Sequence, residues 1–537
     1  MSDATMGSAP AAGRDLSNDT HPATIPVFVL LLVCGIGYAV YGLLSDINNT
    51  GQSPLAIGAF VLLGLALLIA LGFEFVNGFH DTANAVATVI YTNSLPAPVA
   101  VVWSGIWNFL GVLTSSGAVA YSIIALLPTD LVLNVGSGSG FAMIFALLIA
   151  AIIWNLGTWW LGLPNSSSHA LIGSVIGVGL ANQLMAPSGQ AAAGVQWGAA
   201  IGVLKGLIFS PIAGFILAAL LLLILKFLVR NKTLYTAPEG KKPPPLWIRS
   251  ILVLTCTSVS FAHGGNDGQK GMGLIMLILI GVAPTAFALN RTIPESSTPG
   301  FLKVSEQASQ VFKTHSAGQA AVDPSAARHL VDDALNRKDV VQPQVFAALS
   351  VITDDIRNQV KSYGAIRHVP AAQTTNMRND MYLADSAVTA IGKEKGAVSG
   401  PEASTLKSYK SALEKGTRFI PTWVKVSVAI ALGLGTMVGW KRIVKTVGER
   451  IGKTHLTYAQ GAASEIVAAG TIGLAEAYGL PVSTTHILSS GVAGTMAANG
   501  SGLQWGTVKA LGAAWVLTLP AAITISACLF YIFRHLF

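Results

Sequence analysis

A stretch of polar residues interrupts a part of the sequence that hydropathy would place inside a lipid bilayer. Residues 72–88 read GFEFVNGFHDTANAVAT and follow a long apolar segment. A charged side chain at the bilayer centre costs ~3 kcal/mol on insertion scales, and polar groups at that depth usually face a cavity and mark the path of an ion or substrate. Glu74, His80 and Asp81 are therefore candidates for a transport or binding site.

This polar pattern occurs twice, and so does a second one. Residues 260–273 read SFAHGGNDGQKGMG. When this segment is aligned with the first one, Asp267 corresponds to Asp81 and Lys270 corresponds to Asn84. The segments that start at positions 162 and 479 begin with GLPNSSSH and GLPVSTTH. Two different motifs that repeat in the same order indicate an internal duplication. In a membrane protein they predict a transporter built from two repeats, with the site at their interface.

Composition places the chain in a lipid bilayer. Of 537 residues, 52% are hydrophobic and only 11% are charged. Several apolar segments are longer than about 18 residues, the length that indicates a transmembrane helix. The net charge of +8 does not indicate a nucleic-acid partner, because the basic residues lie in short loops where membrane topology explains them. Residues 1–25 lack the basic start of a cleaved secretion signal, so residues 26–44 are expected to be a retained span of a multi-pass protein.

The predicted fold is an all-α integral membrane protein with two inverted-topology repeats. We expect broken helices at the polar segments 77–84 and 263–270, and re-entrant half-helix hairpins at the two Leu-Pro motifs. The predicted organisation is a polar tail (1–25), an extra span with its loop (26–53), the first repeat (54–228), a basic cytoplasmic linker (229–248), the first part of the second repeat (249–289), a soluble insertion (290–420) and the rest of the second repeat (421–537).

The insertion is identified by its charge and by the unequal length of the repeats. Residues 290–420 hold 29 of the 58 formal charges of the chain, so this segment is expected to lie in water as a small helical domain. His169 follows Asp81 by 88 positions, whereas His486 follows Asp267 by 219. The difference equals the 131 residues of the insertion.

Two clusters of hydroxyl side chains stand where helices are expected to begin. Each follows Leu-Pro and precedes an apolar run, which is the position of a helix N-cap. Unpaired backbone N–H groups, the positive end of the helix dipole and hydroxyl donors make such an end an anion site. Two facing ends would hold a tetrahedral oxyanion without any arginine; the alternative is that they only cap two helices. The cluster residues are Ser166, Ser167, Ser168, Ser483, Thr484 and Thr485.

The two repeated carboxylates, Asp81 and Asp267, would repel an oxyanion unless a cation neutralised them. Their expected role is to bind the coupling cation, which is a proton, sodium or a divalent metal that travels with the anion. They are metal ligands only if sodium or a metal–phosphate complex is carried. The alternative is a structural ion pair, for which Asp267 has a partner three positions later in Lys270. Asp81 has no such neighbour.

Further polar residues in the spans are assigned from their chemistry. Amide side chains suit either cation ligation or hydrogen bonding to an oxyanion; we assign Asn77 and Asn266 to the cation, and Asn84 and Gln269 to phosphate. His80 either carries a proton near neutral pH or is a hydrogen-bonded fixture. Glu465 lies in an apolar span and is a candidate gate or coupling carboxylate. His169 and His486 follow the hydroxyl clusters, and we expect both to orient them without binding the ligand.

A membrane enzyme or sensor that works through the insertion is the alternative from another functional class. The insertion shows no nucleotide-binding loop and no metal-ligand cluster, and the polar motifs lie in the spans. In SSSH and STTH a hydroxyl stands beside a histidine, but adjacent residues on a helix do not face each other as a nucleophile and base must. We therefore expect a transporter, not an enzyme, and no cofactor.

The four motifs NGFHDTANAVATVIY, AHGGNDGQKGMG, GLPNSSSH and GLPVSTTH resemble the paired signatures of the inorganic phosphate transporter (PiT) family. The resemblance is closest to the bacterial low-affinity phosphate transporters. It implies an inverted-repeat symporter of inorganic phosphate in the cell (inner) membrane, usually a homodimer. In such bacterial members the driving ion is typically the proton and the cargo can be a neutral metal–phosphate complex, whereas other branches use sodium.

The resemblance also assigns residues. It places the family's cation-binding aspartates on Asp81 and Asp267, its late functional glutamate on Glu465, and its phosphate-binding hydroxyls on the two clusters. The family's commoner Gly-Ala-Asn-Asp reads Gly-Phe-His-Asp here, with His80 in place of the asparagine, which favours protons over sodium. The extra span at residues 26–44 and the insertion are departures from the family pattern.

The leading hypothesis is a proton-coupled phosphate symporter. Two alternatives share the fold: a permease for sulfate or another tetrahedral oxyanion, and a sodium-coupled phosphate symporter. Phosphate at neutral pH can donate a hydrogen bond that a nearby carboxylate accepts, and sulfate cannot, so the aspartates favour phosphate.

Overall fold

Every regular element that the computed structural model describes is a helix. The described ranges are Leu16 and residues 24–50, 57–81, 83–124, 126–127, 137–185, 195, 197–238, 240, 242–320, 322–394 and 396–536. Extended backbone pairs within them only at an isolated bridge between Gly452 and Leu503. The chain divides into two compact units, the first made of Met1–Gly42, Phe60–Ile278 and Pro421–Phe537, and the second of Leu43–Ala59 and Leu279–Ile420.

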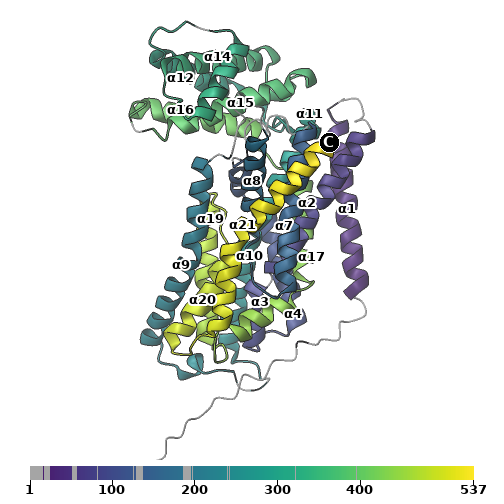
Figure 1. Ribbon diagram of the computed structural model, residues 1–537, viewed down its shortest axis with the longest axis vertical. Coiled ribbons are helices and arrows are strands. Elements are labelled where there is room, and N and C mark those ends of the chain that lie inside the picture. The colour runs from purple at the N-terminus through teal and green to yellow at the C-terminus, as the bar shows by residue number, and fades with distance from the viewer. Residues whose placement is uncertain are drawn as a thin grey trace, which may run out of the picture. The chain divides into compact units, whose positions relative to one another are not determined.

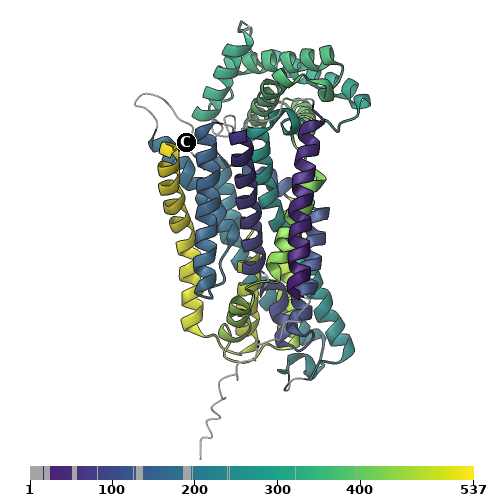
Figure 2. The same cartoon turned by 90° about the vertical axis from the view of Figure 1, so that its right-hand side faces the viewer.

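The first unit consists of long helices that run side by side, with shorter ones between them (Figures 1 and 2). The helices that lie wholly or mostly in it are α1 (Thr24–Asn48), α2 (Ile57–Asp81), α3 (Ala83–Tyr91), α4 (Ala97–Thr114), α5 (Ala118–Ile124), α7 (Gly138–Trp160), α8 (Ser167–Leu184), α9 (Trp197–Leu228), the 3-10 helix η1 (Lys232–Tyr235), α10 (Leu246–Val282), α17 (Thr422–Thr436), α18 (Lys441–Lys445), the π-helical turn η4 (Thr446–Arg450), α19 (Tyr458–Ala477), α20 (Thr484–Asn499) and α21 (Trp505–Leu536).

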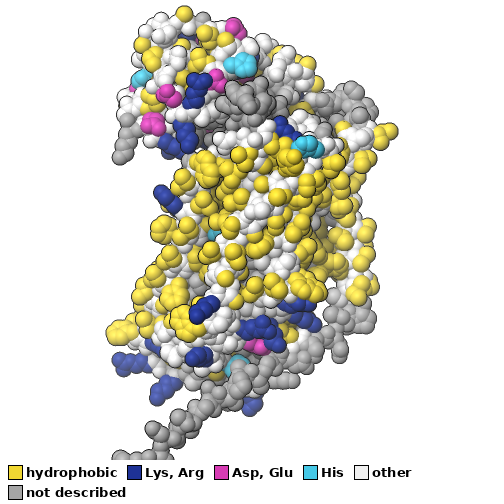
Figure 3. Space-filling model, in the orientation of Figure 1, with side chains coloured by type: hydrophobic (Ala, Val, Ile, Leu, Met, Phe, Trp, Pro, Cys, Tyr) yellow, Lys and Arg dark blue, Asp and Glu magenta, His cyan; other side chains and the backbone are white. Residues whose placement is uncertain are grey.

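The first unit has the surface of a membrane protein. Within the described ranges, seven helical segments are long and apolar enough to cross a bilayer: α1, the α2–α3 pair, α4, α7, α9, α10 and α21. Large apolar side chains such as Leu30, Ile106 and Val516 are exposed on these helices, where lipid would cover them. Hydrophobic side chains cover the long helices on the face shown in Figure 3. The predicted all-α membrane fold is confirmed, and the expected span at residues 26–44 is α1.

The structure tests one of the two predicted helix breaks. The predicted break at 77–84 stays a prediction, because α2 and α3 are separated only at Thr82, which lies outside the described residues. In the second repeat the expected break at 263–270 is wrong, because α10 runs through it without interruption. The polar side chains of this segment find partners on other helices and on one another, as His263 does with Asn108, so the helix backbone keeps its own hydrogen bonds.

The short helices that follow the Leu-Pro motifs make corresponding contacts in the two repeats. Helix α8 follows α7 and packs on α21, whereas α20 follows α19 and packs on α9. Ser166 caps α8 by accepting a hydrogen bond from the backbone N–H of His169 at 3.2 Å, and Ser483 caps α20 in the same way at 3.1 Å. The correspondence supports the duplication. The inverted orientation of the repeats and the re-entrant placement of the hairpins stay predictions.

Glycines at equivalent positions permit this close packing. Gly177 of α8 and Gly494 of α20 each lie eight residues after the histidine of their motif. A Cβ on Gly177 would lie 2.2 Å from the carbonyl oxygen of Ile523 in α21, and a Cβ on Gly494 would lie 2.2 Å from that of Phe215 in α9. No side chain fits at such a distance, so both positions require glycine for the backbones to approach.

The second unit has a hydrophobic core of its own. Its helices are α11 (Pro284–Phe287), η2 (Glu295–Ser297), α12 (Thr298–His315), α13 (Pro324–Arg337), α14 (Pro343–Tyr363), η3 (Ile366–His368), α15 (Ala371–Ile391) and α16 (Gly400–Thr417). Tyr409 is fully buried in this core and donates a hydrogen bond to Thr353 at 3.2 Å. Arg328 forms ion pairs with Asp380 at 2.5 Å and Asp355 at 2.9 Å and so joins α13 to α15 and α14.

Gly177→Ala is expected to destabilise the protein by ~1–3 kcal/mol, because the added methyl group meets a backbone carbonyl that cannot rotate away. Thermal unfolding of the purified full-length chain in detergent measures this effect. Gly157→Ala on α7 is the matched control, because a Cβ there has nothing within 4 Å, and alanine favours the helix more than glycine does. Equal unfolding temperatures for the two variants would contradict the packing of α8 on α21.

A fragment of residues 283–420 is expected to fold by itself, since its core side chains all come from residues 289–413. Circular dichroism should show a helical fragment with one cooperative thermal transition. In this fragment Tyr409→Ala should cost ~3–5 kcal/mol, as the loss of a buried ring usually does. Lys407→Ala, on the exposed side of the same helix, should change stability by less than about 0.5 kcal/mol. A fragment without a cooperative transition would show that the insertion needs the rest of the chain.

Candidate functional site

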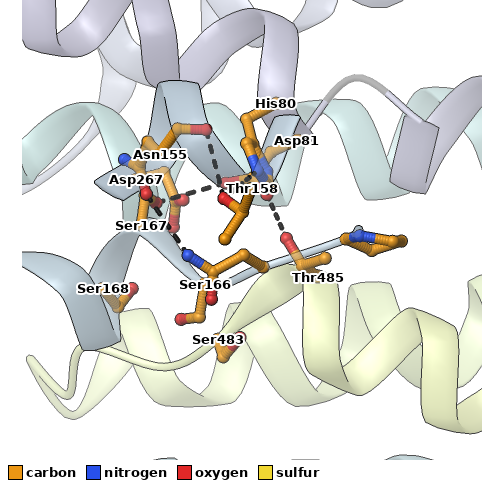
Figure 4. A network of polar contacts seen from close by, with 12 residues as sticks. His80, Asp81, Asn155, Thr158, Ser166, Ser167, Ser168, Asp267, Ser483 and Thr485 are labelled. Carbon is orange, nitrogen blue, oxygen red and sulfur yellow. Dashed lines mark hydrogen bonds and ion pairs between the residues drawn. The ribbon is translucent and has the colours of Figure 1, made fainter. Parts of the chain in front are cut away.

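Asp81, the last residue of α2, is the centre of a buried polar cluster. This residue is only 2% exposed. One carboxylate oxygen accepts a hydrogen bond from the hydroxyl of Thr485, and the other accepts one from the hydroxyl of Ser167 at 3.2 Å (Figure 4). Thr485 lies in the first turn of α20 and Ser167 in the first turn of α8. The N-terminal ends of the two short helices, one from each repeat, therefore meet at a single carboxylate.

The other hydroxyls of the two clusters have different partners. Ser166 and Ser483 are the N-caps, so their oxygens already accept backbone hydrogen bonds. Ser168 donates to the backbone carbonyl of Val482 at 2.8 Å and thereby ties the first cluster to the second. The buried hydroxyl of Thr484 has no hydrogen-bond partner among the described residues. The clusters thus cap two helices, and two of their hydroxyls donate to the carboxylate of Asp81.

Asp267 lies close to Asp81 but is compensated differently. The ammonium nitrogen of Lys270 lies 2.6 Å from Asp267 Oδ2, and both side chains are almost fully buried. The same ammonium donates to the hydroxyl oxygen of Ser167 at 3.2 Å. The ion pair that the sequence left as an alternative is therefore present. It connects Asp267 through Ser167 to the carboxylate of Asp81.

His263 joins the two carboxylates, and sequence reasoning missed it. Its Nε2 lies 3.3 Å from Asp267 Oδ2 and 3.6 Å from Asp81 Oδ2, while its Nδ1 lies 2.6 Å from Asn108 Oδ1. The signal was present in the duplication, because the spacing that places Asp267 on Asp81 also places His263 on Asn77. Both positions carry a polar side chain one helical turn before the aspartate.

Asp81, His263 and Asp267 could bind a cation, since their ligand atoms all lie within 4.8 Å of one another. A cation at Asp267 would face the fixed positive charge of Lys270. Asp81 forms no ion pair with a lysine or arginine in the described part of the chain; the imidazoles of His263 and His80, which are charged only when protonated, face it at 3.6 Å and 3.9 Å. A proton or monovalent ion at Asp81 therefore suits this geometry better than a divalent ion between the carboxylates.

His80 lies beside this centre. Its Nε2 is 3.2 Å from the hydroxyl oxygen of Thr158 in α7, and its Nδ1 is 3.9 Å from Asp81 Oδ1. The Nδ1 atom is buried and has no hydrogen-bond partner among the described residues. This placement fits either predicted role, the proton carrier or the fixture that holds α2 against α7.

The amide side chains are dispersed around the cluster. Asn266 donates to the backbone carbonyl of Leu480 at 3.1 Å and so holds the loop that leads into α20. Asn77 donates to Glu74 at 3.4 Å. Gln269 accepts from the backbone N–H of Val119 at 2.8 Å, and its own hydrogen bonds go to Gly265 and Glu476, not to the hydroxyl clusters. The side chain of Asn84 lies outside the described residues.

Glu465 belongs to a separate buried group. This carboxylate in α19 is fully buried and accepts hydrogen bonds from the hydroxyls of Thr88 in α3 and Thr255 in α10. Neither threonine stands out in the sequence. Each lies in a run of apolar and small hydroxyl residues, so nothing in the sequence distinguishes it from a threonine that bonds only to its own helix.

The two motif histidines contact each other across the repeats. The rings of His169 and His486 have centroids 4.7 Å apart, and His486 stacks on Trp515 of α21 with centroids 4.2 Å apart. Their position at the junction of α8, α20 and α21 fits the expected role of orienting the two helix ends.

The chain is similar to known transporters over most of its length. The family described as the phosphate transporter family matches residues 77–526. The chain is 42% identical over 499 residues to the low-affinity inorganic phosphate transporter PitA of Escherichia coli (strain K12), covering 88% of this chain and 96% of that protein. It is 28% identical to the probable low-affinity inorganic phosphate transporter of Bacillus subtilis (strain 168), covering 89% and 99%.

Among solved structures, a sodium-dependent phosphate transporter is 18% identical, covers 89% of this chain and 100% of its own, and gives a TM-score of 0.47. The family match contains both copies of each duplicated motif, and the resemblance inferred from those motifs is confirmed. The chain therefore belongs to the phosphate transporter family.

Proposed function

We propose that this chain is a secondary active symporter that carries inorganic phosphate across the cell membrane with protons. Family membership and the names of the bacterial relatives support phosphate as the cargo. The observation that carries the mechanism is at Asp81, which accepts hydrogen bonds from Ser167 and Thr485 at the ends of two helices. These hydroxyls are the donors that we assign to phosphate.

Proton loading and phosphate binding are coupled because they involve the same donors. An ionised Asp81 engages both hydroxyls and repels an oxyanion placed between the helix ends. A proton on Asp81 cancels this charge and reduces its capacity to accept hydrogen bonds. The hydroxyls of Ser167 and Thr485 then turn to the oxyanion, together with backbone N–H groups at the starts of α8 and α20. Phosphate therefore enters with a proton and leaves when the proton is lost.

The remaining hydroxyls and histidines support this centre. Ser166 and Ser483 keep the two helix ends open by capping them, and Ser168 holds one end against the other. Thr484 contributes a hydroxyl that is not engaged by another described residue. The side chains assigned to the coupling cation beside the carboxylates are Asn77, His80 and Asn266. Asn84 and Gln269 are assigned to phosphate, and His169 and His486 to orienting its site.

Glu465 is proposed as a second coupling group. It is fully buried, and its two threonine partners come one from each repeat. A proton that reaches Glu465 would weaken both contacts. The charge state of Glu465, like that of Asp81, can therefore bias how the two repeats pack.

Phosphate is favoured over sulfate, because hydrogen phosphate donates a hydrogen bond to a carboxylate and sulfate leaves that acceptor unpaired. We also propose that one form of the cargo is a neutral metal–phosphate complex and that the protein forms a homodimer in the lipid bilayer. The likeness to the family supports both proposals.

Asp81→Asn is expected to reduce proton-driven phosphate uptake to the level of empty liposomes, because the amide accepts no proton and provides no change of charge. The measurement is accumulation of labelled phosphate in proteoliposomes under an imposed proton gradient. Thr485→Val should raise the KM for phosphate about 10-fold through the loss of one donor to an anion. Ser489→Ala is the matched control and should leave KM unchanged, because the hydroxyl of Ser489 lies on the same helix, is buried and has no hydrogen-bond partner among the described residues. Normal uptake by Asp81→Asn would exclude the proposed coupling.

Competition for uptake by the wild-type protein tests the cargo and the driving ion together. Unlabelled phosphate and arsenate are expected to compete with labelled phosphate, and sulfate is expected to compete at least about 10-fold less well because it cannot donate a hydrogen bond. Replacing sodium by choline should not change the rate if protons drive uptake. Dependence on magnesium would identify the metal–phosphate form. A strict sodium requirement would instead favour the sodium-coupled alternative.

A further inference from the structure

The two repeats are unequal in charge at equivalent positions. We infer that Lys270 is a built-in cation of the second repeat, which permanently neutralises Asp267, so that of the two repeated aspartates only Asp81 loads an exchangeable cation in each transport cycle. This inference rests on the proposed function and specifies which of the repeated aspartates is a coupling site. It makes Lys270 a positioning residue that keeps Asp267 from taking a transported cation.

The duplication supplies the first observation. Asp81 and Asp267 occupy the same position of their motifs, and three positions later the first repeat has Asn84 where the second has Lys270. Two copies of one motif thus keep the carboxylate and differ by one full positive charge beside it. A neutral amide leaves its carboxylate to be neutralised by a cation from solution, whereas a lysine brings its own.

The structure shows that this lysine is used as a counter-ion. Its ammonium lies 2.6 Å from Asp267 Oδ2, and both residues belong to the uninterrupted helix α10, one turn apart. Lys270 is fully buried, and a buried ammonium without a partner would be strongly unfavourable. Because both ends of the contact are fixed to one helix, neither can leave with the cargo.

Asp81 has no such resident charge. Its hydrogen bonds come from the neutral hydroxyls of Thr485 and Ser167. The imidazoles of His263 and His80 face it at 3.6 Å and 3.9 Å, and these carry a charge only when protonated. Among the described residues Asp81 therefore depends on a proton or ion from solution, which is what a coupling site requires.

Other groups face Lys270 as well. It donates to Ser167 at 3.2 Å, and Glu74 of α2 packs against the neighbouring Gly271, where an added Cβ would lie 2.2 Å from Glu74 Cγ. The contact with Ser167 also raises a competing role, in which the ammonium binds phosphate directly. The two roles differ in a measurable way, because only the counter-ion role becomes unnecessary when Asp267 is made neutral.

The binding test replaces Lys270 by the residue of the first repeat. In purified full-length Lys270→Asn, Asp267 is left without its counter-ion and should take a cation from solution. Thermal unfolding in NaCl against choline chloride is expected to show a sodium-dependent rise of about 2 °C or more, as ligand binding to the folded state produces. Neither the wild-type protein nor Asp267→Asn/Lys270→Asn should show it. A K270N protein indifferent to sodium would overturn the inference.

The transport test uses the same variants in proteoliposomes. Each single substitution, D267N or K270N, should lower phosphate uptake in sodium-free buffer by roughly 100-fold or more, because it leaves an uncompensated buried charge. The double variant D267N/K270N should recover to within about 10-fold of wild type, and K270R should retain uptake because it keeps the charge. A double variant as inactive as K270N, with K270R active, would assign Lys270 to phosphate and overturn the inference.

The two tests separate this inference from the proposed function. If the wild-type protein takes up no phosphate, the proposed function fails, while the sodium-dependent unfolding of K270N still decides whether Asp267 needs an added cation. If wild-type uptake is normal and K270N shows no sodium effect, only the inference fails. If K270N folds in sodium chloride but not in choline chloride, this difference is the expected stabilisation of the folded variant by sodium.

Discussion

Burying ionised carboxylates in an apolar helical unit is the constraint on which the site depends. Such a group is costly away from water unless hydrogen bonds or an opposite charge compensate it. Asp267 is compensated by the ammonium of Lys270, Asp81 by two hydroxyls, and Glu465 by two threonine hydroxyls. Only the first compensation is a full charge. The other two carboxylates gain most from a proton or cation, which makes them suited to coupling.

The hydroxyls reach Asp81 because of how the helices pack. Helix α8 is held on α21 and α20 on α9, at glycines that allow backbone contact, and the N-terminal ends of both short helices come together. Donors that belong to helix ends are neutral groups, so they attract an oxyanion without the strong, persistent charge of an arginine. Weak, reversible binding of this kind suits a carrier that must release its cargo.

Much of this site could be predicted from the sequence, and the errors have physical causes. The hydroxyl clusters, the carboxylates and the caps were recognisable because charge in an apolar run and N-cap chemistry are local signals. The expected break in α10 was wrong, because a helix keeps its backbone bonds when polar side chains such as that of His263 find partners on neighbouring helices. His263 was missed, because a side chain's partners depend on packing and not on its own motif.

The sequence by itself determined the membrane class, the duplication, the length of the insertion and the two carboxylates that repeat with it. These properties depend on composition and on the spacing of residues along the chain, which are the same in any fold. Only the tertiary structure decided that Thr485 bonds to Asp81, some 400 positions away, that Lys270 reaches both Asp267 and Ser167, and that Glu465 lies in a group of its own. Such contacts join distant segments, and they exist only once helices from both repeats have packed together.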